Sequence, residues 1–136
     1  MKINQILSIT ILFLVLMSCE DGLNCLIPKS AQLKNKTFPV ATVDSYYYAD
    51  LKAEINNEPR DQDYDYFFEV EGLPEGMDYF VNFRTISIEG SPQVSGTFDF
   101  TIYLFVEGPF GNQYDGSERP ICDQSTSKNY TLIVED

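Results

Sequence analysis

The 136-residue chain contains no histidine and no tryptophan. The absence of histidine removes the commonest general base and the commonest ligand of transition metals. It also excludes the catalytic arrangements in which a histidine activates a serine or a cysteine. Carboxylates are plentiful, but no pair stands out by its spacing as a glycosidase-type acid and base. The sequence therefore predicts a protein that is not an enzyme, with no catalytic residues, no metal and no cofactor.

Basic residues are also scarce. Nine Lys and Arg stand against 21 Asp and Glu, which gives a formal net charge of −12. Binding to nucleic acid needs clustered Lys and Arg to neutralise phosphates, so we expect no nucleic-acid partner. An acidic surface instead favours solubility, cations or a basic protein partner.

Aromatic residues are the one abundant class, with ten Phe and nine Tyr. Such bulky side chains on short strands suit a compact sandwich core. Hydrophobic residues make up 43% of the chain, as is usual for a folded domain. The length allows one domain and a short appendage.

The amino terminus has the pattern of a secretory signal. Lys2 precedes an apolar run over residues 6–17, which is too short to favour a membrane span. The run ends in Leu16-Met17-Ser18-Cys19, which resembles the lipobox of bacterial lipoproteins. That resemblance implies removal of residues 1–18, a diacylglyceryl thioether on Cys19 and an acylated amino group, with acyl chains such as palmitate. An ordinary signal with a chance cysteine, or an uncleaved anchor, is the alternative.

The residues after Cys19 bear on location. Glu20 and Asp21 resemble the export tag that carries some lipoproteins to the outer face of the outer membrane. We therefore expect a cell-envelope protein that is lipid-anchored to the outer membrane and surface-exposed. A periplasm-facing anchor remains open. Residues 19–37 are predicted to form the lipidated cysteine and a tether.

Two further cysteines, Cys25 and Cys122, remain after lipidation. An even number of cysteines in an exported protein suggests a disulfide. This disulfide would close a loop that includes most of the domain. Closing such a loop lowers the entropy of the unfolded chain and would stabilise the fold by roughly 4 to 5 kcal/mol. Two free thiols are the alternative.

Alternation of apolar and polar residues predicts the strands. In residues 97–106, the apolar side chains at even positions from Phe98 to Val106 face one way and the intervening ones face the other. Similar alternation occurs over residues 46–55, 64–70, 77–83, 86–88 and 130–134, with turn signals between the runs. Residues 37–43 are expected to form a first edge strand with Phe38 and Val40 inward. About seven short strands and no helix predict an all-β, antiparallel β-sandwich.

Four motifs then carry a resemblance. Gly-Leu-Pro-Glu-Gly-Met at 72–77, Ile-Glu-Gly-Ser-Pro at 88–92, Gly-Thr-Phe-Asp-Phe-Thr-Ile at 96–102 and Tyr-Thr-Leu-Ile-Val at 130–134 follow one another in order. They resemble the cadherin-like immunoglobulin family related to dystroglycan-type domains. The resemblance implies a single immunoglobulin/cadherin-like domain over residues 38–136. Ile86 replaces a usual Gly, and the last hairpin is longer than usual. Domains of this type serve many extracellular roles, so the resemblance bears on fold more than on function.

Two segments are candidates for ligand contact. Asp61, Asp63 and Asp65 alternate as in a calcium loop, but Tyr66 stands where such a loop needs Gly, so a solvated acidic loop is the preferred interpretation. The long segment over residues 107–129 is the better candidate. It carries Phe110, Tyr114 and Ile121, and aromatic side chains on long loops serve protein contacts and stacking on sugars. The alternative is that this loop packs over the end of the sheet.

The sequence thus predicts a membrane-anchored lipoprotein that acts as a non-enzymatic binding or structural module for an extracellular protein or glycan. A periplasm-facing inhibitor or immunity-type lipoprotein that captures a basic enzyme is the alternative. A small hydrolase is a third possibility. The sequence makes no prediction of oligomeric state.

Overall fold

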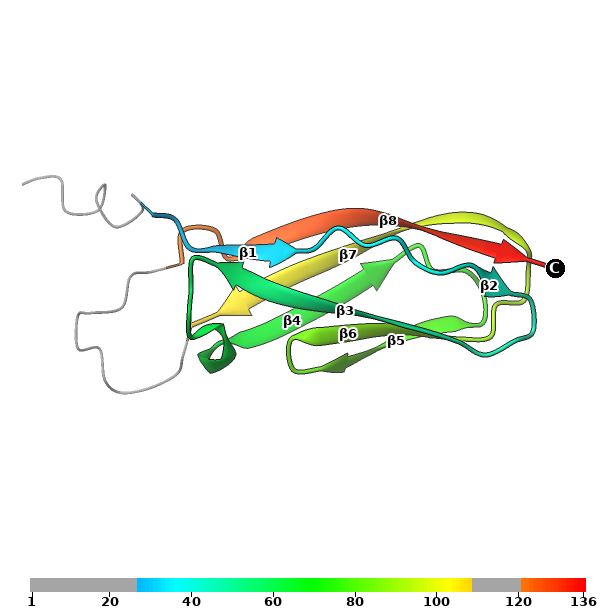
Figure 1. Ribbon diagram of the computed structural model, residues 1–136, viewed down its shortest axis with the longest axis horizontal. Coiled ribbons are helices and arrows are strands. Elements are labelled where there is room, and N and C mark those ends of the chain that lie inside the picture. The colour runs from blue at the N-terminus through cyan, green and yellow to red at the C-terminus, as the bar shows by residue number, and fades with distance from the viewer. Residues whose placement is uncertain (1–26, 109–120) are drawn as a thin grey trace, which may run out of the picture.

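The computed structural model describes residues 27–108 and 121–136, which form two packed sheets (Figure 1). The described elements are β1 (Ser30–Leu33), β2 (Ala41–Thr42), β3 (Tyr47–Asn56), the 3-10 helix η1 (Asp61–Asp63), β4 (Asp65–Glu71), β5 (Met77–Asn82), β6 (Thr85–Gly90), β7 (Gly96–Glu107) and β8 (Ser125–Glu135). One sheet has the order β1-β3-β6-β5 and the other the order β2-β8-β7-β4.

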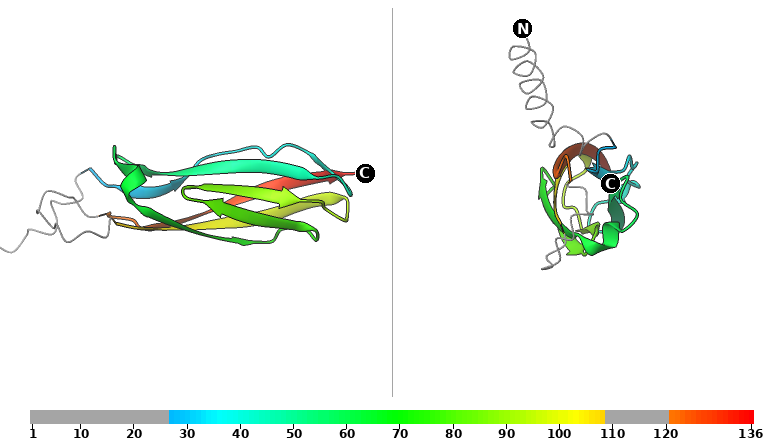
Figure 2. Two further views of the ribbon diagram at one scale, coloured as in Figure 1. Left: turned by 90° about the horizontal axis from the view of Figure 1, so that it is seen from below. Right: turned by 90° about the vertical axis from the view of Figure 1, so that its left-hand side faces the viewer.

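This strand order is that of an immunoglobulin-like sandwich. With the strands lettered in that fold's convention, the two sheets read A-B-E-D and A′-G-F-C, which contain the ABED and CFG sheets of an immunoglobulin domain. All described pairings within the sheets are antiparallel except the short parallel pair of β2 with β8. Figure 2 shows the two sheets facing each other along the length of the molecule. The predicted all-β, immunoglobulin-like sandwich is confirmed, with eight described strands where about seven were expected.

The core forms where the alternating strands turn their apolar faces inward. On β3 the five residues predicted to face inward are all at most 7% exposed. These residues are Tyr47, Ala49, Leu51, Ala53 and Ile55. On β7 the predicted inward row starts at Phe98, which is partly buried against the core, and from Phe100 to Val106 it is at most 1% exposed. The alternation read from the sequence is therefore confirmed for β3 and β7, each of which has a neighbouring strand on both sides.

Three aromatic rings from distant parts of the chain meet in this core. Phe38 packs edge-on against Phe100 and against Tyr130, with ring centroids 5.2 and 5.4 Å apart. Phe100 and Tyr130 stack at 5.8 Å. The segment between β1 and β2 is thereby fixed against the opposite sheet, because edge-on and offset aromatic pairs add directional contact to burial.

The start of the sandwich differs from the prediction. The domain was expected to begin at residue 38, but β1 already pairs with β3, with Ala31 and Leu33 buried. Phe38 is buried as expected, whereas Val40 is 51% exposed and the strand predicted over residues 37–43 is reduced to β2. Two apolar residues among many polar ones give too weak an alternation to reveal β1 from sequence.

Two other expectations are corrected. Phe83 was placed on the inward face with Met77, but it lies in the turn between β5 and β6 at a φ of 55° and is 48% exposed. A turn breaks strand alternation, so the period-2 rule no longer applies there. The last strand, expected from Tyr130, begins at Ser125 and pairs with β7 over its length.

Two of the glycine motifs meet at the end of the molecule where the carboxyl terminus lies. Gly76 and Gly90 have φ values of 87° and 136°, which disfavour residues with a Cβ. A Cβ on Gly76 would collide with the carbonyl oxygen of Ser91, and a Cβ on Gly90 with the carbonyl oxygen of Gly76. The Ser91 amide donates a hydrogen bond to that Gly76 oxygen at 2.9 Å. The motifs at 72–77 and 88–92 therefore hold β5 beside β6 through direct backbone contact.

One buried tyrosine lacks a hydrogen-bond partner. Tyr47 is 7% exposed, and its hydroxyl has no partner among the described residues. The Tyr130 hydroxyl, which is equally enclosed, donates to the carbonyl oxygen of Lys34 at 2.8 Å. Burial raises the pKa of each phenol to about 12.

We predict opposite effects for the matched changes Tyr47→Phe and Tyr130→Phe. Tyr47→Phe removes an unsatisfied buried hydroxyl and should raise the free energy of unfolding by about 1 kcal/mol. Tyr130→Phe removes a formed hydrogen bond and should lower it by about 1 kcal/mol. Denaturant titration of the two variants measures both. A loss of stability in Tyr47→Phe equal to that in Tyr130→Phe would contradict the assignment of Tyr47 as unsatisfied.

Candidate functional site

The outer face of the β2-β8-β7-β4 sheet carries exposed aromatic side chains. Phe67 on β4 is 50% exposed, and Tyr103 and Phe105 on β7 are each 40% exposed. All three stand at positions opposite in alternation to the buried rows of their strands. Exposed apolar groups of this size gathered on one face commonly mark an interaction surface.

Strand register arranges these residues in rows across the sheet. Phe67 lies opposite Phe105, which lies opposite Ser125. Two residues along the strands, a second row consists of Glu69, Tyr103 and Ser127. Between the two rows lie Phe68, Leu104 and Thr126, whose side chains alternate to the inner face of the sheet. These nine residues line a shallow depression of about 510 Å³, which we call the cross-strand groove.

The walls of the cross-strand groove are chemically different. One wall is apolar, because the rings of Phe67 and Phe105 pair with centroids 6.2 Å apart and an interplanar angle of 40°. The other wall is polar: the Tyr103 hydroxyl donates to Oε2 of Glu71 at 3.2 Å. That hydrogen bond, and then the charge of Glu71, raise the pKa of Tyr103 above its ordinary value.

The outer face of this sheet is uniformly acidic. Its outward positions include the carboxylates of Asp65, Glu69, Glu71, Asp99, Glu107 and Glu135. None of the described Lys or Arg residues occupies an outward position of β4, β7 or β8. Lys128 on β8 alternates to the other side, where its Nζ donates to the carbonyl oxygen of Leu33 at 3.1 Å. Among the described residues, the charged side chains at outward positions of β4, β7 and β8 are thus all acidic.

Most of the predicted site residues cannot be compared with this groove. Cys19, Cys25, Phe110 and Tyr114 lie outside the described residues, so their predicted roles stay predictions. Ile121 is described and packs, partly buried, against the core. The loop predicted over residues 107–129 is shorter than expected, because β8 already begins at Ser125, and Ser125 belongs to the lining of the groove.

The residues around Cys122 pair with the first described residues of the domain. The Cys122 amide donates to the carbonyl oxygen of Lys29 at 2.9 Å, and Ser30 forms a parallel bridge with Asp123. Cys122 is not a free thiol. Because Cys25 precedes Lys29 by only four residues in the sequence (29 − 25), this pairing is compatible with a Cys25–Cys122 disulfide. That disulfide stays a prediction.

The acidic loop before β4 is occupied by ion pairs. Asp61 pairs with Nη1 of Arg84, and Asp63 faces Nε of Arg60 at 4.0 Å. In residues 27–108 and 121–136, no three His, Cys, Asp or Glu side chains gather as a metal site would require. The carboxylates of Asp61 and Asp63 therefore face guanidinium groups rather than a shared point.

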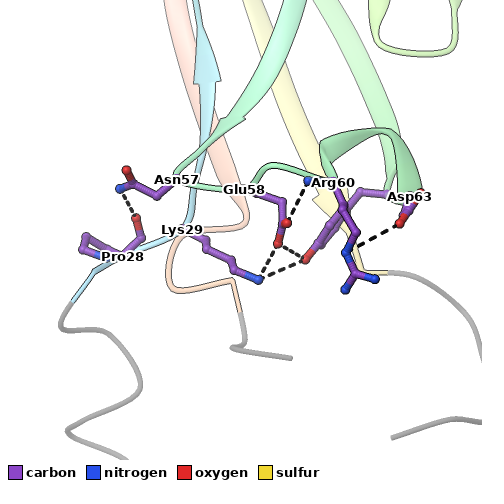
Figure 3. Close-up of polar contacts among 7 residues, drawn as sticks. Pro28, Lys29, Asn57, Glu58, Arg60 and Asp63 are labelled. Atoms are coloured by element: carbon purple, nitrogen blue, oxygen red, sulfur yellow. Dashed lines mark hydrogen bonds and ion pairs between the residues drawn. The ribbon is translucent and has the colours of Figure 1, made fainter. Parts of the chain in front are cut away.

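A second polar cluster joins the start of the domain to the loop after β3 (Figure 3). Glu58 pairs with Lys29 and accepts a hydrogen bond from the Tyr64 hydroxyl at 2.8 Å. Its other oxygen accepts the Arg60 amide at 3.0 Å, and the Asn57 amide group donates to the carbonyl oxygen of Pro28 at 2.9 Å. Burial opposes ionisation of Glu58, but these donors outweigh it and lower the pKa of Glu58. The cluster fixes the entering chain to the sandwich.

The sequence indicated which aromatic side chains face outward, but not that they lie side by side and form a groove. Alternation already placed Phe67 and Tyr103 on the outward faces of their strands, where aromatic residues are unexpected if the face is only solvated. It did not say that the two strands are neighbours, nor that Phe67 faces Phe105. That information comes from the register of β4 against β7.

No protein-family model matches the chain, and no curated protein matches it either. Solved structures share its fold. One alignment, with an endo-fucoidan hydrolase of glycoside hydrolase family 107, covers 81% of this chain and 14% of the enzyme, at 12% identity and a TM-score of 0.54. The chain also aligns with 18% of a proposed α-galactosidase from Bacteroides fragilis, at 13% identity and a TM-score of 0.49, and with 99% of the titin M3 domain, at 10% identity and 0.41.

The chain therefore spans less than a fifth of those two enzyme chains, and at such identity the likeness concerns fold alone. Within the ranges that the structure describes, no helix is long and apolar enough to cross a membrane.

We predict that Glu58→Gln destabilises the domain by about 2 kcal/mol, because the change leaves the half-buried Lys29 ammonium without its counter-charge. The side chains of Glu58 and Lys29 are only 5% and 13% exposed. Since the folded pKa of Glu58 is lowered, the stabilisation is present at neutral pH and is lost as pH falls below about 4.5.

The control for this prediction is Asp63→Asn. The ion pair of Asp63 with Arg60 is exposed, with side chains 45% and 62% accessible, and should contribute less than about 0.5 kcal/mol. Denaturant unfolding at pH 7 and at pH 4 measures both variants. Equal effects of the two changes would contradict a structural role for the Glu58 cluster.

Proposed function

We propose that this chain is a lipid-anchored, non-enzymatic binding module that holds its ligand in the cross-strand groove. The observation that carries the proposal is the exposed pair of Phe67 and Phe105, which forms an apolar wall on the outer face of the sheet. Leaving two such rings in water forgoes the free energy of burying them, at roughly 25 cal/mol per Å². A partner that covers the groove would recover it.

The composition of the groove suits recognition. Aromatic residues dominate the energetics of interfaces because they bury large areas with few rotatable bonds. Hydroxyl and carboxylate groups at Ser125, Ser127 and Glu69 supply polar contacts around the rings. A few polar groups beside an apolar wall are typical of a ligand site. The glycan-degrading enzymes that share the fold support no choice of ligand, since only the fold is common to them and this chain.

The anchor is proposed from the lipobox-like sequence that ends at Cys19. The first strand, β1, begins at Ser30, eleven positions after Cys19 (30 − 19). An extended chain of that length spans at most roughly 39 Å. The end of the sandwich where β1 starts is also the end where β7 stops and β8 begins (Figure 1). We propose that the domain stands close to the outer membrane on its outer surface.

A second candidate is a periplasm-facing inhibitor or immunity-type lipoprotein that captures a basic enzyme. The observation that favours it is the purely acidic outer face around the groove. It would use the same groove on the other side of the membrane, so the two candidates differ in location.

We predict that Cys19→Ser moves the protein from the membrane fraction to the soluble fraction, because several acyl chains are needed for stable anchoring. Cell fractionation followed by immunoblotting measures this change. Protease treatment of intact cells should release the wild-type domain if it faces outward. Retention of Cys19→Ser in the membrane would refute the lipid anchor, and protection from protease would support the periplasm-facing alternative.

We predict that the double change Phe67→Ser and Phe105→Ser weakens the affinity for the ligand at least tenfold without unfolding the domain. The test is retention of purified oligosaccharides and of synthetic peptides of defined charge by the detergent-solubilised lipoprotein. Phe80→Ser is the control, since Phe80 is 61% exposed on the other sheet. If the double variant and Phe80→Ser retain every ligand as well as the wild type does, the groove is not the binding site.

A further inference from the structure

We infer that the ligand of the cross-strand groove is an arginine-bearing polypeptide segment whose guanidinium group enters between the two walls. This inference rests on the proposed function and narrows it to one class of partner. It is carried by three features of the described residues: the spacing of the rows, the chemistry of the walls and the sign of the surrounding charge.

The spacing of the rows suits one flat group. Phe67 and Glu69, like Phe105 and Tyr103, are two residues apart on a strand, so their rows are separated by about 6.7 Å. Non-bonded heavy atoms approach to about 3.5 Å. The gap therefore accommodates a single planar layer with contact on both sides. A guanidinium is planar, whereas an ammonium is compact and more strongly hydrated.

The walls match the two faces of an arginine head group. The rings of Phe67 and Phe105 offer π surface, which attracts a cation and its aliphatic stem. On the opposite wall Glu69 offers a carboxylate, whose negative charge attracts the guanidinium. Tyr103, which lies opposite Glu69, donates its hydroxyl proton to Glu71 and not to Glu69.

The acids bracket the aromatic pair. Asp65 faces Glu107 in the row on one side of the two Phe residues, and Glu69 faces Tyr103 in the row on the other side. Of the described bases, none reaches this face from β4, β7 or β8 to neutralise it. A cation therefore gains from every neighbouring row, while anionic glycans and nucleic acids are repelled.

A second copy of the chain fits this face poorly. Two copies placed face to face would bring the same acidic rows together, and like charges across an interface cost free energy. A neutral glycan could stack on the rings but would leave the carboxylates without a charged partner. The observations thus favour a basic protein segment over both.

The other sheet provides an internal comparison. It too exposes aromatic rings, with Phe80 61% and Tyr48 57% accessible. Two of its acids are matched by bases. Glu54 pairs with Lys34 at 2.6 Å, and Asp50 with Lys36 at 3.4 Å. Asp78 and Glu89 lie opposite each other on that sheet, so exposed rings beside carboxylates occur on both sheets. The cross-strand groove is distinguished by the depression between its apolar and acidic rows.

The test uses the detergent-solubilised lipoprotein and four fluorescent Gly-Ser peptides that carry three Arg, three Lys, three citrulline or three Glu residues. Citrulline keeps the planar shape of arginine and lacks its charge. Fluorescence anisotropy should show the Arg peptide binding tightest, the Lys peptide weaker, and the citrulline and Glu peptides at least tenfold weaker than the Arg peptide. Raising the salt concentration from 50 to 500 mM should markedly weaken the binding of the Arg peptide.

Two double variants with the same change in net charge separate site binding from general attraction to an acidic protein. Glu69→Gln combined with Glu71→Gln should lower the affinity for the Arg peptide at least tenfold. Asp78→Asn with Glu89→Gln, on the outer face of the other sheet, should leave its affinity within twofold of the wild type. Thermal unfolding confirms that both variants fold.

The outcomes distinguish the inference from the proposed function. If the two double variants weaken binding of the Arg peptide equally, the peptide is held by diffuse electrostatic attraction to an acidic protein. That result overturns the inference. Binding of a neutral oligosaccharide that depends on Phe67 and Phe105, without binding of the Arg peptide, overturns the inference and leaves the proposed function standing. If changes at Phe67 and Phe105 affect no ligand, both fail.

Discussion

The rest of the structure depends on the inward row of side chains on β7. Phe100, Ile102, Leu104 and Val106 are almost completely buried, and they occupy the middle of the core between the two sheets. Side chains of a strand alternate with a period of two, so this row also places Tyr103 and Phe105 on the outer face. Core and groove are therefore two sides of one strand. A slip of one residue would expose the core row and bury the groove residues.

The positions of the other strands are fixed by contacts that leave little freedom. At the end near the carboxyl terminus, Gly76 and Gly90 allow two turns to touch through their backbones, which sets β5 against β6. At the opposite end, Glu58 holds Lys29 and Tyr64 together and fixes the entering chain beside β4. The sheet that carries the groove lies between these two fixed ends, and its outer face is free of any described element.

Much of the fold could be predicted from local pattern, and the failures have a common cause. Strong alternation over ten residues identified β3, and the row from Phe98 to Val106 identified β7. Where few apolar residues are present the pattern is weak, so β1 was taken for tether and Val40 for a buried residue. At Phe83 a turn interrupts the period, and only the backbone conformation there reveals that the ring is exposed.

The sequence by itself determined which side chains share a face of each strand, the acidic charge, the exclusion of histidine-dependent chemistry and the lipobox-like segment. These properties follow from composition and from neighbours along the chain. Only the tertiary structure decided that Phe67 meets Phe105, 38 residues later (105 − 67), and that Glu69 meets Tyr103. Alternation fixes the face of a residue but not its partner across the sheet. Pairing depends on strand order and register, which are set by the packing of the whole sandwich.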